Sequence, residues 1–270
     1  MPEMPEVEQV RKTLAPHIIG KKILSVEVRL PRLIQQMTAE EFEKALTGCR
    51  IDQVQRRGKY LLLQTERGTL VVHLRMTGAL IATEGGAEPP YAKVRFQLTG
   101  DTVLWFTDIR TFGTLYFVQD VNSISGLAAL GPEPLTQWLT AEYLQAKAAR
   151  AKKPVKSFIL DQTVIAGLGN IYADEALFLA GLAPLRQACE LTADEVVRLI
   201  AAVNKVIAQG IKNHGTTFRD YKDGEGKKGS NQNFLNVYSR GGQPCKVCGQ
   251  ILNKTKVGGR GTVWCSHCQK

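Results

Sequence analysis

The amino-acid sequence predicts an α+β protein of several domains, and three observations lead to this prediction. Short β-type runs recur at close intervals from about residue 22 to residue 118. Beyond the Gly/Pro segment at 131–134, the spacing of apolar residues becomes helical. Two Cys-x-x-Cys pairs lie near the end. A chain of 270 residues with 44% hydrophobic content can bury one large core, or two of ordinary size, and a small module besides.

The chain begins M-P-E-M-P-E-V-E, which is typical of a helix N-terminus. Pro5 suits a first helical turn, Glu6 suits the positive end of the helix dipole, and Val7 and Val10 have roughly helical spacing. In an alternative interpretation Pro2 itself takes part in a reaction, because removal of Met1 would leave the secondary amine of Pro2 at the N-terminus. These first residues alone do not decide between the two.

Eight β-type runs follow this helix, separated by turn signals such as E-R-G-T and T-G-D. The pattern predicts a two-layered antiparallel sandwich or a flattened barrel, with the N-terminal helix packed on it. The runs are residues 22–30, 51–57, 59–65, 69–76, 78–83, 92–99, 102–108 and 113–119.

The helical part contains Ala-rich and Leu-rich stretches at 140–153 and 192–210. Residues 156–182 predict a helix, a glycine turn and a second helix that starts near Asn170, a residue typical of an N-cap. Residues 221–233, rich in Gly and Lys, predict a mobile polar loop. We therefore expect a sandwich domain at 1–133, a helical domain at 134–235 and a ribbon at 236–270.

The ribbon carries two Cys-x-x-Cys pairs separated by sixteen residues. This spacing predicts that four thiolates close a tetrahedron around one structural zinc ion. Two disulfides would suit a secreted chain, and the acidic start lacks the features of a signal peptide. Cys49 and Cys189 are more typical of small buried hydrophobic residues. The expected zinc ligands are Cys245, Cys248, Cys265 and Cys268.

Positive charge is concentrated in the last quarter of the chain. Residues 201–270 contain twelve Lys or Arg and three acidic residues, out of a formal net charge of +10. Such a basic segment is typical of a protein that binds a polyanion, although a solvated basic surface is the simpler alternative. No apolar run approaches the roughly 18 residues of a membrane span, so we expect a cytoplasmic protein without a membrane segment. Nothing in the sequence suggests more than a monomer.

Seven motifs occur in a fixed order along the chain. They are P-E-M-P-E-V-E from residue 2, R-R-G-K-Y at 56–60, H-L-R-M at 73–76, D-I-R-T-F-G at 108–113, G-P-E-P at 131–134, D-Q-T-V-I-A-G-L-G-N-I-Y-A-D-E at 161–175, and G-R-G-T within the ribbon. Together they resemble bacterial formamidopyrimidine-DNA glycosylase, and the resemblance runs from residue 2 to the end.

This resemblance implies a β-sandwich, a helix-two-turns-helix domain and a zinc finger that together grip damaged double-stranded DNA. It also implies base excision repair: removal of oxidised purines such as 8-oxoguanine and formamidopyrimidines, followed by β,δ-elimination at the abasic site. The enzyme would then be bacterial and cytoplasmic, and associated with the nucleoid through its DNA binding.

The resemblance assigns the chemistry to four residues. With Met1 removed, the amine of Pro2 has a reference pKa of about 7.7 to 8.0, well below about 10.4 for lysine, so a useful fraction is unprotonated. Pro2 would form the Schiff base at C1′, and Glu3 would help to open the sugar ring. Lys59 would contact phosphate, help to depress the pKa of Pro2 and donate a proton in β-elimination. Arg260 would bind phosphate and donate a proton in δ-elimination.

The same resemblance identifies DNA-binding residues. Met76, Arg110 and Phe112 match a triad that fills the gap left by the extruded base, and Arg110 would bind the orphaned base opposite it. Taken singly, Met76 and Phe112 would more often be core residues. Asn170 would hold a backbone phosphate at a helix N-terminus, and Arg150 matches another DNA contact.

Several positions depart from the family pattern. Tyr91 stands where many members have a DNA-contact histidine, which puts one phosphate contact in doubt. His73 is a further candidate contact, although a lone strand histidine is more often structural. His214 and Ser239 stand where glycine is usual. The loop at 217–235, which in the family closes over the extruded base, varies too much to predict lesion preference.

Two other functions are compatible with much of this sequence. An endonuclease VIII-like enzyme would prefer oxidised pyrimidines, but the E-M-P-E-V start and the complete Met/Arg/Phe triad argue against it. A non-catalytic DNA-binding protein would keep the basic zinc module and lose the reaction. The retention of Pro2, Glu3 and Lys59 argues against that alternative.

Overall fold

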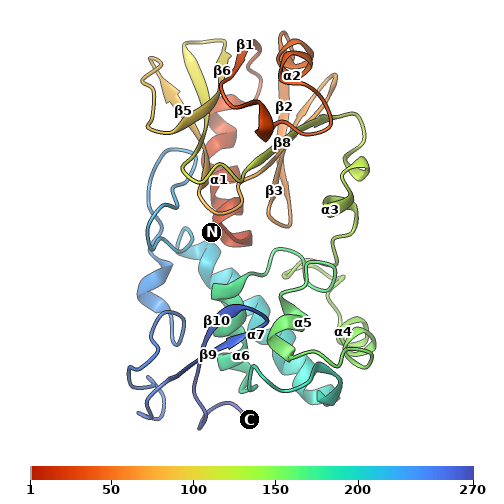
Figure 1. The fold of residues 1–270 in the computed structure, drawn as a ribbon, viewed down its shortest axis with the longest axis vertical. Helices are drawn as coiled ribbons and strands as arrows, with labels where there is room; N and C mark the ends of the chain where they lie inside the picture. The colour runs from red at the N-terminus through yellow and green to blue at the C-terminus, as the bar shows by residue number, and fades with distance from the viewer. Residues whose placement is uncertain (1) are drawn as a thin grey trace. The chain divides into compact units, whose positions relative to one another are not determined.

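The structure is a computed structural model that describes residues 2–270. The chain forms two compact units (Figure 1). Unit 1 extends to Ala128 and also includes Asn213–Ser230, whereas unit 2 comprises Ala129–Lys212 and Asn231–Lys270. In the described part of the chain, no helix is both long enough and apolar enough to cross a bilayer.

Unit 1 contains two four-stranded antiparallel sheets, with strand orders β1-β6-β7-β5 and β2-β3-β4-β8. Because the two sheets stay separate, the fold is a sandwich rather than a closed barrel, as one of the two sequence alternatives predicted. Each strand begins and ends within two residues of its predicted run, except that β4 ends three residues before the end of the run at 69–76. The strands are β1 (Ile23–Val28), β2 (Ile51–Arg57), β3 (Tyr60–Thr65), β4 (Gly68–His73), β5 (Gly78–Glu84), β6 (Ala92–Leu98), β7 (Thr102–Asp108) and β8 (Thr114–Val118).

Helix α1 (Met4–Ile18) packs against this sandwich. Its residues Val7, Val10 and Leu14 are fully buried in a core cluster that includes side chains of both sheets. Helix α2 (Ala39–Leu46) is held at its start by a capping box between Thr38 and Glu41. The remaining helical elements of unit 1 are α3 (Ser125–Ala128) and two short 3₁₀ turns, Pro31–Leu33 and Val121–Ser123.

Unit 2 is helical, with a small two-stranded ribbon. Gly210 of the longest helix lies against Tyr172 of its neighbour so closely that an added Cβ would be 2.6 Å from the tyrosine ring. The buried side chains of Phe178, Val237 and Val263 join the ribbon to the helices. The elements are α4 (Ala141–Ala148), α5 (Val155–Ile159), α6 (Asn170–Ala180), α7 (Ala193–Lys212), β9 (Asn253–Val257), β10 (Arg260–Trp264) and 3₁₀ turns at Ala188–Glu190 and Asn231–Phe234.

The start of α6 corrects one local prediction. Gly169 occupies the N-cap position with an extended backbone, and Asn170 is the first helical residue. The N-cap interpretation of Asn170 is therefore wrong by one position. The backbone N–H groups of the first helical turn still point out of the N-terminal end of α6, where Asn170 lies, as they do in any α-helix.

Candidate nucleic-acid interface and catalytic residues

Pro2 and Glu3 are buried at the start of α1. The Glu6 carboxylate accepts a hydrogen bond from the N–H of Glu3 at 2.8 Å and from the N–H of Thr216 at 2.7 Å. One buried side chain therefore fixes the peptide next to Pro2 and also a segment far along the chain. The predicted removal of Met1 concerns a residue that lies outside the described part of the chain.

The segment at 213–230 is tied to α1 and to β5. The N–H of Gly224 donates to the Thr13 hydroxyl at 2.9 Å, and the Gly224 carbonyl accepts from the N–H of Ala82 at 3.0 Å. The Tyr221 hydroxyl lies 3.3 Å from the carbonyl oxygen of Glu6. These bonds hold Tyr221 and Gly224 of the expected polar loop against α1, which begins directly after Pro2 and Glu3.

Lys59 lies in the turn between β2 and β3, where Gly58 has a φ of +57°. The Lys59 side chain is largely buried. Tyr60 pairs with His73 across β3 and β4, and their rings meet edge to face with centroids 4.5 Å apart. The His73 Nδ1 accepts the N–H of Arg75 at 3.0 Å. Burial, reinforced by the charges of Arg75 and Lys59, lowers the pKa of His73 to about 3, so the imidazole is neutral at pH 7.

The three residues of the expected gap-filling triad lie in two loops of unit 1. Met76 is half-buried in the β4–β5 turn, whereas Arg110 and Phe112 are exposed in the β7–β8 loop. The Arg110 guanidinium lies over the Phe112 ring, 4.9 Å from its centroid. The two loops are joined through Thr77, whose hydroxyl binds the Asp108 carboxylate and accepts the N–H of Arg110. A cation stacked on an exposed ring can enter a base stack as one unit.

Tyr91 and two other departures from the family pattern share a backbone feature. Tyr91, His214 and Ser239 all have positive φ, at +63°, +60° and +64°. This region favours glycine, which agrees with the expectation, from the family resemblance, of glycine at 214 and 239. The Tyr91 side chain is exposed, and its carbonyl accepts the N–H of Asp108 at 3.1 Å.

Asn170 contacts the β9–β10 hairpin. Its Nδ2 donates to the Gly261 carbonyl at 3.0 Å, and its Oδ1 is buried and accepts no hydrogen bond from any residue in 2–270. The Lys156 ammonium also donates to Gly261 O, at 2.9 Å, and to the Thr262 hydroxyl, at 2.8 Å. Asn170 of α6 and Lys156 of α5 are therefore both bonded directly to the hairpin, next to Arg260 in the sequence.

Lys156 and Asp174 form an ion pair with Nζ and Oδ1 2.6 Å apart, and both side chains are almost completely buried. The other carboxylate oxygen of Asp174 accepts the N–H of Val263 at 3.1 Å. Burial raises the pKa of Asp174 to about 6, although Lys156 opposes the rise. Sequence reasoning did not select Lys156 or Asp174, because a buried ion pair has no local pattern.

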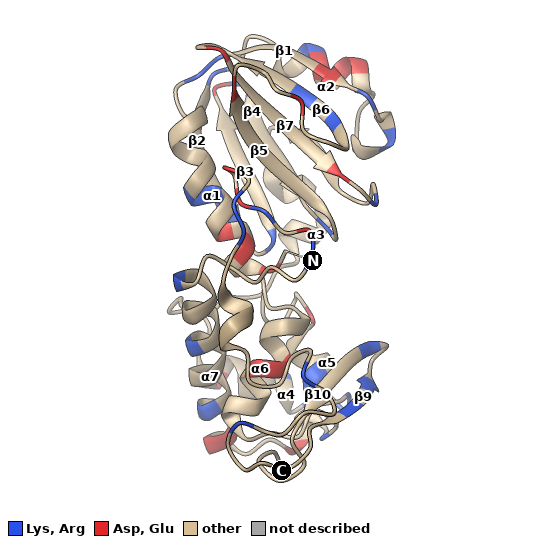
Figure 2. Ribbon diagram, turned by 90° about the vertical axis from the view of Figure 1, so that its left-hand side faces the viewer, with Lys and Arg blue, Asp and Glu red and all other residues tan. Residues whose placement is uncertain are grey.

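Arg260 is exposed at the first position of β10, immediately after Gly258 and Gly259, which both have positive φ. This is the tight ribbon turn expected from the sequence. Arg150 is exposed just beyond α4. Figure 2 marks Lys and Arg positions in blue along β9 and β10, in agreement with the basic segment seen in the sequence.

The four ribbon cysteines fit one zinc ion. Their Sγ atoms lie within 4.8 Å of one another, with Cys248 and Cys265 3.5 Å apart and Cys245 and Cys268 4.0 Å apart. A Zn–S distance of about 2.3 Å gives a tetrahedral S–S edge of about 3.8 Å. Although burial opposes it, the backbone N–H groups of residues 248 and 247 lower the pKa of the Cys245 thiol to about 7, which favours the thiolate form of a zinc ligand. The predicted zinc site is confirmed.

The two remaining cysteines differ in their surroundings. Cys49 is buried, as expected for a small hydrophobic residue, and belongs to the core cluster of unit 1. Cys189 is exposed, so the expectation of burial is wrong for this residue. It lies in the short 3₁₀ turn at Ala188–Glu190, where only Ala188 is buried.

Three known domain families match successive parts of the chain. The formamidopyrimidine-DNA glycosylase N-terminal domain matches residues 1–115, and the formamidopyrimidine-DNA glycosylase H2TH domain matches residues 130–222. The zinc finger found in FPG and IleRS matches residues 242–270.

Full-length relatives show the same similarity. The formamidopyrimidine-DNA glycosylase of Pelotomaculum thermopropionicum is 46% identical, over 100% of this chain and 99% of that protein. That of Moorella thermoacetica is 48% identical, over 95% of each.

Solved structures agree closely in fold. Lactococcus lactis Fpg in complex with abasic-site DNA has a TM-score of 0.93 at 34% identity and 99% coverage of both chains. The MutM (Fpg) protein of Thermus thermophilus has a TM-score of 0.90 at 39% identity, covering 99% of this chain and 98% of that one.

Proposed function

The chain belongs to the formamidopyrimidine-DNA glycosylase family, and from this membership we propose that it is a DNA glycosylase of base excision repair with abasic-site lyase activity. Its substrates are oxidised purines in duplex DNA, 8-oxoguanine and formamidopyrimidines. The observation that carries the proposal is that this chain is similar to these enzymes over its whole length, and its sequence has Pro2, Glu3 and Lys59 within the motifs that resemble the family.

Pro2 performs the first covalent step in this proposal. After removal of Met1 its nitrogen is a secondary amine, which attacks C1′ of the damaged nucleotide while the base leaves with the bonding electrons of the glycosidic bond. The product is an aminal, in which C1′ is bonded to the Pro2 nitrogen and to O4′; cleavage of the C1′–O4′ bond then opens the ring and gives an iminium, which draws electrons from C2′ and acidifies its protons. Glu3 supplies the proton that opens the sugar ring, and Glu6 holds the Glu3 N–H beside the nucleophile.

Lys59 and Arg260 act on the phosphates. Loss of a C2′ proton expels the 3′ phosphate in β-elimination. Lys59 donates a proton in this step, and its positive charge lies near the phosphate. A second elimination expels the 5′ phosphate, with Arg260 as its phosphate ligand and proton donor. The rigid guanidinium fork suits Arg260 to this task, and its exposed place at the hairpin turn leaves it accessible to DNA.

DNA binding involves residues of both units. Met76, Arg110 and Phe112 fill the gap left by the extruded base, and Arg110 hydrogen-bonds the base opposite. Asn170 and Arg150 contact the backbone. His73 is mostly buried and neutral, so any contact it makes with DNA is that of a neutral ring. Tyr91 offers an exposed ring and hydroxyl where relatives have a histidine.

In our proposal the domains are the catalytic sandwich at 1–133, the helix-two-turns-helix domain with the lesion-recognition loop at 134–235, and the zinc finger at 236–270. One zinc ion on the four cysteines stabilises the ribbon and so supports the Arg260 turn. The enzyme acts as a monomer on duplex DNA, in the bacterial cytoplasm and in association with the nucleoid.

Borohydride trapping tests the central step. Reduction should link the processed protein covalently to a duplex that contains 8-oxoguanine, and mass spectrometry should place the link on Pro2. A version with one additional residue before Pro2 should give no adduct yet bind an abasic-site analogue with similar affinity. If the extended version excises the lesion as fast as the processed protein, Pro2 is not the nucleophile.

The substrate class is tested separately. Excision of 8-oxoguanine should be much faster than excision of thymine glycol in the same duplex context. The opposite ranking would indicate an enzyme for oxidised pyrimidines.

A further inference from the structure

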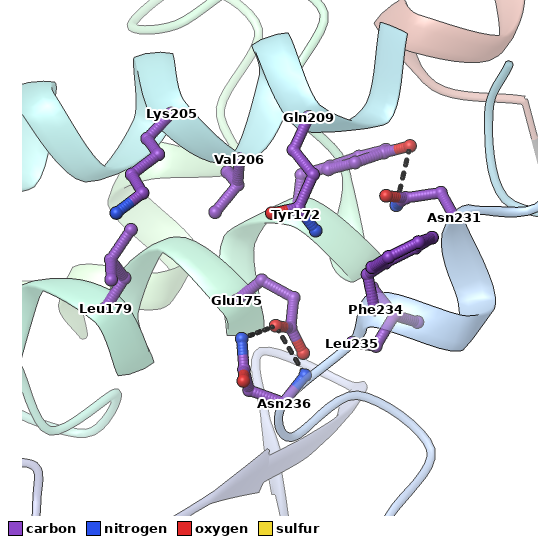
Figure 3. Close-up of a pocket in the computed structure, with 10 residues that line it drawn as sticks. All are labelled: Tyr172, Glu175, Leu179, Lys205, Val206, Gln209, Asn231, Phe234, Leu235 and Asn236. Carbon is purple, nitrogen blue, oxygen red and sulfur yellow. Dashed lines mark hydrogen bonds between the residues drawn. The ribbon is translucent and has the colours of Figure 1, made fainter. Parts of the chain in front are cut away.

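Unit 2 contains a cavity that the proposed function leaves unassigned. It lies between α6, α7 and residues 231–236 and has a volume of about 250 Å³ (Figure 3). None of the DNA-contact residues proposed for unit 2, Arg150, Asn170 and Arg260, lines this cavity. Its walls are therefore separate from these three proposed contacts, although Asn231, Phe234 and Leu235 belong to the end of the 217–235 loop.

The floor of the cavity is preorganised by Glu175 of α6. Its Oε2 accepts the backbone N–H and the side-chain Nδ2 of Asn236, at 2.8 and 3.0 Å. Its Oε1 accepts the N–H groups of Val237 and Tyr238, at 2.8 and 2.9 Å. Four hydrogen bonds to one buried carboxylate fix residues 236–238 against α6, so this wall exists before any ligand arrives.

Two polar groups of α7 remain available to a ligand. Lys205 and Gln209 are four residues apart and therefore share a helix face, and both line the cavity. Figure 3 shows the Gln209 amide extending from α7 toward Glu175, and the Lys205 side chain beside Leu179. Within residues 2–270, neither the Gln209 amide nor the Lys205 ammonium has a hydrogen-bond or ion-pair partner.

The remaining wall is apolar and unusually exposed. Phe234 and Leu179 are 52% and 42% exposed, although both are large hydrophobic side chains, and the buried Val206 and Leu235 complete the apolar lining. Exposed apolar surface beside a few convergent polar groups is the usual composition of a small-molecule site. An aromatic ring next to an amide and a cation suits a flat ligand with a hydrogen-bonding edge and a negative charge.

We propose that this cavity binds a mononucleotide. The base lies against Phe234, its edge pairs with the Gln209 amide, and its phosphate reaches Lys205 beside Leu179. Guanine is the base chosen as a probe, because its O6 acceptor and N1–H donor can pair with the donor and acceptor of one amide group, as the neighbouring donor and acceptor of the other bases also can. A cavity below the roughly 300 to 1,000 Å³ of drug-sized sites is suited to a single base. The proposal is independent of the glycosylase function.

Calorimetric titration with guanosine 5′-monophosphate tests this site. The full-length protein should bind the nucleotide in the presence of a saturating duplex that contains an uncleavable abasic-site analogue. Guanosine should bind about tenfold more weakly, and ribose 5-phosphate should bind more weakly still. Lys205→Ala should weaken nucleotide binding about tenfold while leaving guanosine binding unchanged, whereas Phe234→Ala should weaken the binding of both.

Lys212→Ala is the matched control, because it removes the same charge from a site on α7 that does not line the cavity. It should leave nucleotide binding unchanged. Lys205→Ala and Lys212→Ala should excise 8-oxoguanine at the wild-type rate, which separates this site from the catalytic one. The proposal is overturned if the DNA complex does not bind the nucleotide, or if Lys205→Ala and Phe234→Ala bind it as wild type does.

Discussion

Thr77 and Asp108 connect the two loops of the proposed gap-filling triad: the Thr77 hydroxyl donates to Oδ1 of Asp108 at 2.5 Å. The same oxygen accepts the N–H of Arg110 at 3.2 Å, and Oδ2 accepts the N–H of Gly113 at 2.8 Å. Asp108 is almost fully buried. One carboxylate thus fixes Met76, through its neighbour Thr77, relative to the loop that carries Arg110.

Asp108→Asn should weaken this connection without removing the triad itself. An amide has one acceptor oxygen, so one of the three donors now faces an NH₂ group. We expect a loss of about 1 to 3 kcal/mol in the free energy of unfolding. Single-turnover excision of 8-oxoguanine should slow several-fold, because the wedge is less well supported. Denaturant unfolding and quenched-flow kinetics measure the two effects.

Asp101→Asn is the control for this substitution, since Asp101 is exposed in a turn with positive φ, which asparagine tolerates. Neither its stability nor its excision rate should change. Normal excision by a destabilised Asp108→Asn protein would show that Asp108 supports the fold and not the wedge.

Local patterns predicted the elements well and the connections between them poorly. The eight β-runs match β1 to β8, and the glycine turn before Asn170 is present. Helix α2 was not predicted, although Thr38 and Glu41 form a capping box, because eight residues between strands give little periodicity. The bond from Thr216 to Glu6 joins residues 210 positions apart, and no pattern within either segment indicates it.

Candidate site residues were predictable where a residue type is itself chemically distinctive. The four cysteines are an example, because their spacing alone defines a tetrahedral site. Asp108 lies within a recognised motif, yet only its burial and its three donors reveal that it supports the loops. The roles of the catalytic and DNA-contact residues remain predictions that the experiments above address.

His73 should make stability depend on pH. Its folded pKa of about 3 lies below the ordinary 6.5, so the folded state disfavours the protonated form. Above about pH 6.5, His73 is neutral in both the folded and the unfolded protein and does not reduce stability. As the pH falls from there toward 3, the unfolded state takes up a proton that the folded state does not, so the free energy of unfolding falls progressively. At pH 5 the loss is about 2 kcal/mol, from roughly 1.4 kcal/mol for each pH unit. Urea unfolding at about pH 7.5 and about pH 5 measures it.

His73→Asn should reduce this pH dependence, because asparagine keeps an acceptor for the Arg75 N–H and does not titrate. His214→Asn is the control: the His214 side chain is not buried, and asparagine suits its positive φ, so the wild-type pH dependence should persist. An NMR titration of His73 with a midpoint near the ordinary 6.5 would contradict the assignment of a neutral buried ring.

Arg260→Ala should change the products of strand cleavage. If Arg260 donates the proton of the second elimination, the variant should stop after β-elimination and accumulate the 3′ unsaturated aldehyde. Loss of one phosphate contact should also reduce the slope of log K against log salt by about 0.9. Gel analysis of the 3′ ends and binding at several salt concentrations measure these effects. Lys256→Ala, exposed on the paired strand β9, is the control and should still give δ-product.

Ser239→Gly should stabilise the protein. Ser239 has a φ of +64°, a backbone conformation that costs an L-residue about 1 kcal/mol and costs glycine little. The unfolded chain gains entropy with glycine, which offsets about 0.4 kcal/mol or more, so the net gain should be at most about 0.6 kcal/mol. Thermal unfolding measures it, with Ser266→Gly as a control at a position of ordinary φ that should not gain stability. A lower midpoint for Ser239→Gly would mean that the serine side chain makes a compensating contact.

Lys156→Met should lower the free energy of unfolding far more than removal of one partner of an exposed ion pair does. It leaves the Asp174 carboxylate buried without its cation and removes two hydrogen bonds to Gly261 and Thr262 of the hairpin. Losing one partner of a buried pair costs about 3 to 5 kcal/mol. The more exposed pair of Lys153 and Asp161, 2.8 Å apart, is the matched control, and Lys153→Met should cost less than about 1 kcal/mol.

The double variant Lys156→Met/Asp174→Leu separates the effect of charge from that of support for the hairpin. Replacing both ions with apolar side chains should recover most of the lost unfolding free energy, since no charge is then left buried. The double variant cannot restore the hydrogen bonds from residue 156 to the Gly261 carbonyl and the Thr262 hydroxyl. We therefore expect δ-elimination to be slower than in the wild-type protein in both the single and the double variant, although stability recovers in the double variant. If cleavage recovers together with stability, Lys156 acts only on the fold, and the Arg260 turn does not depend on it.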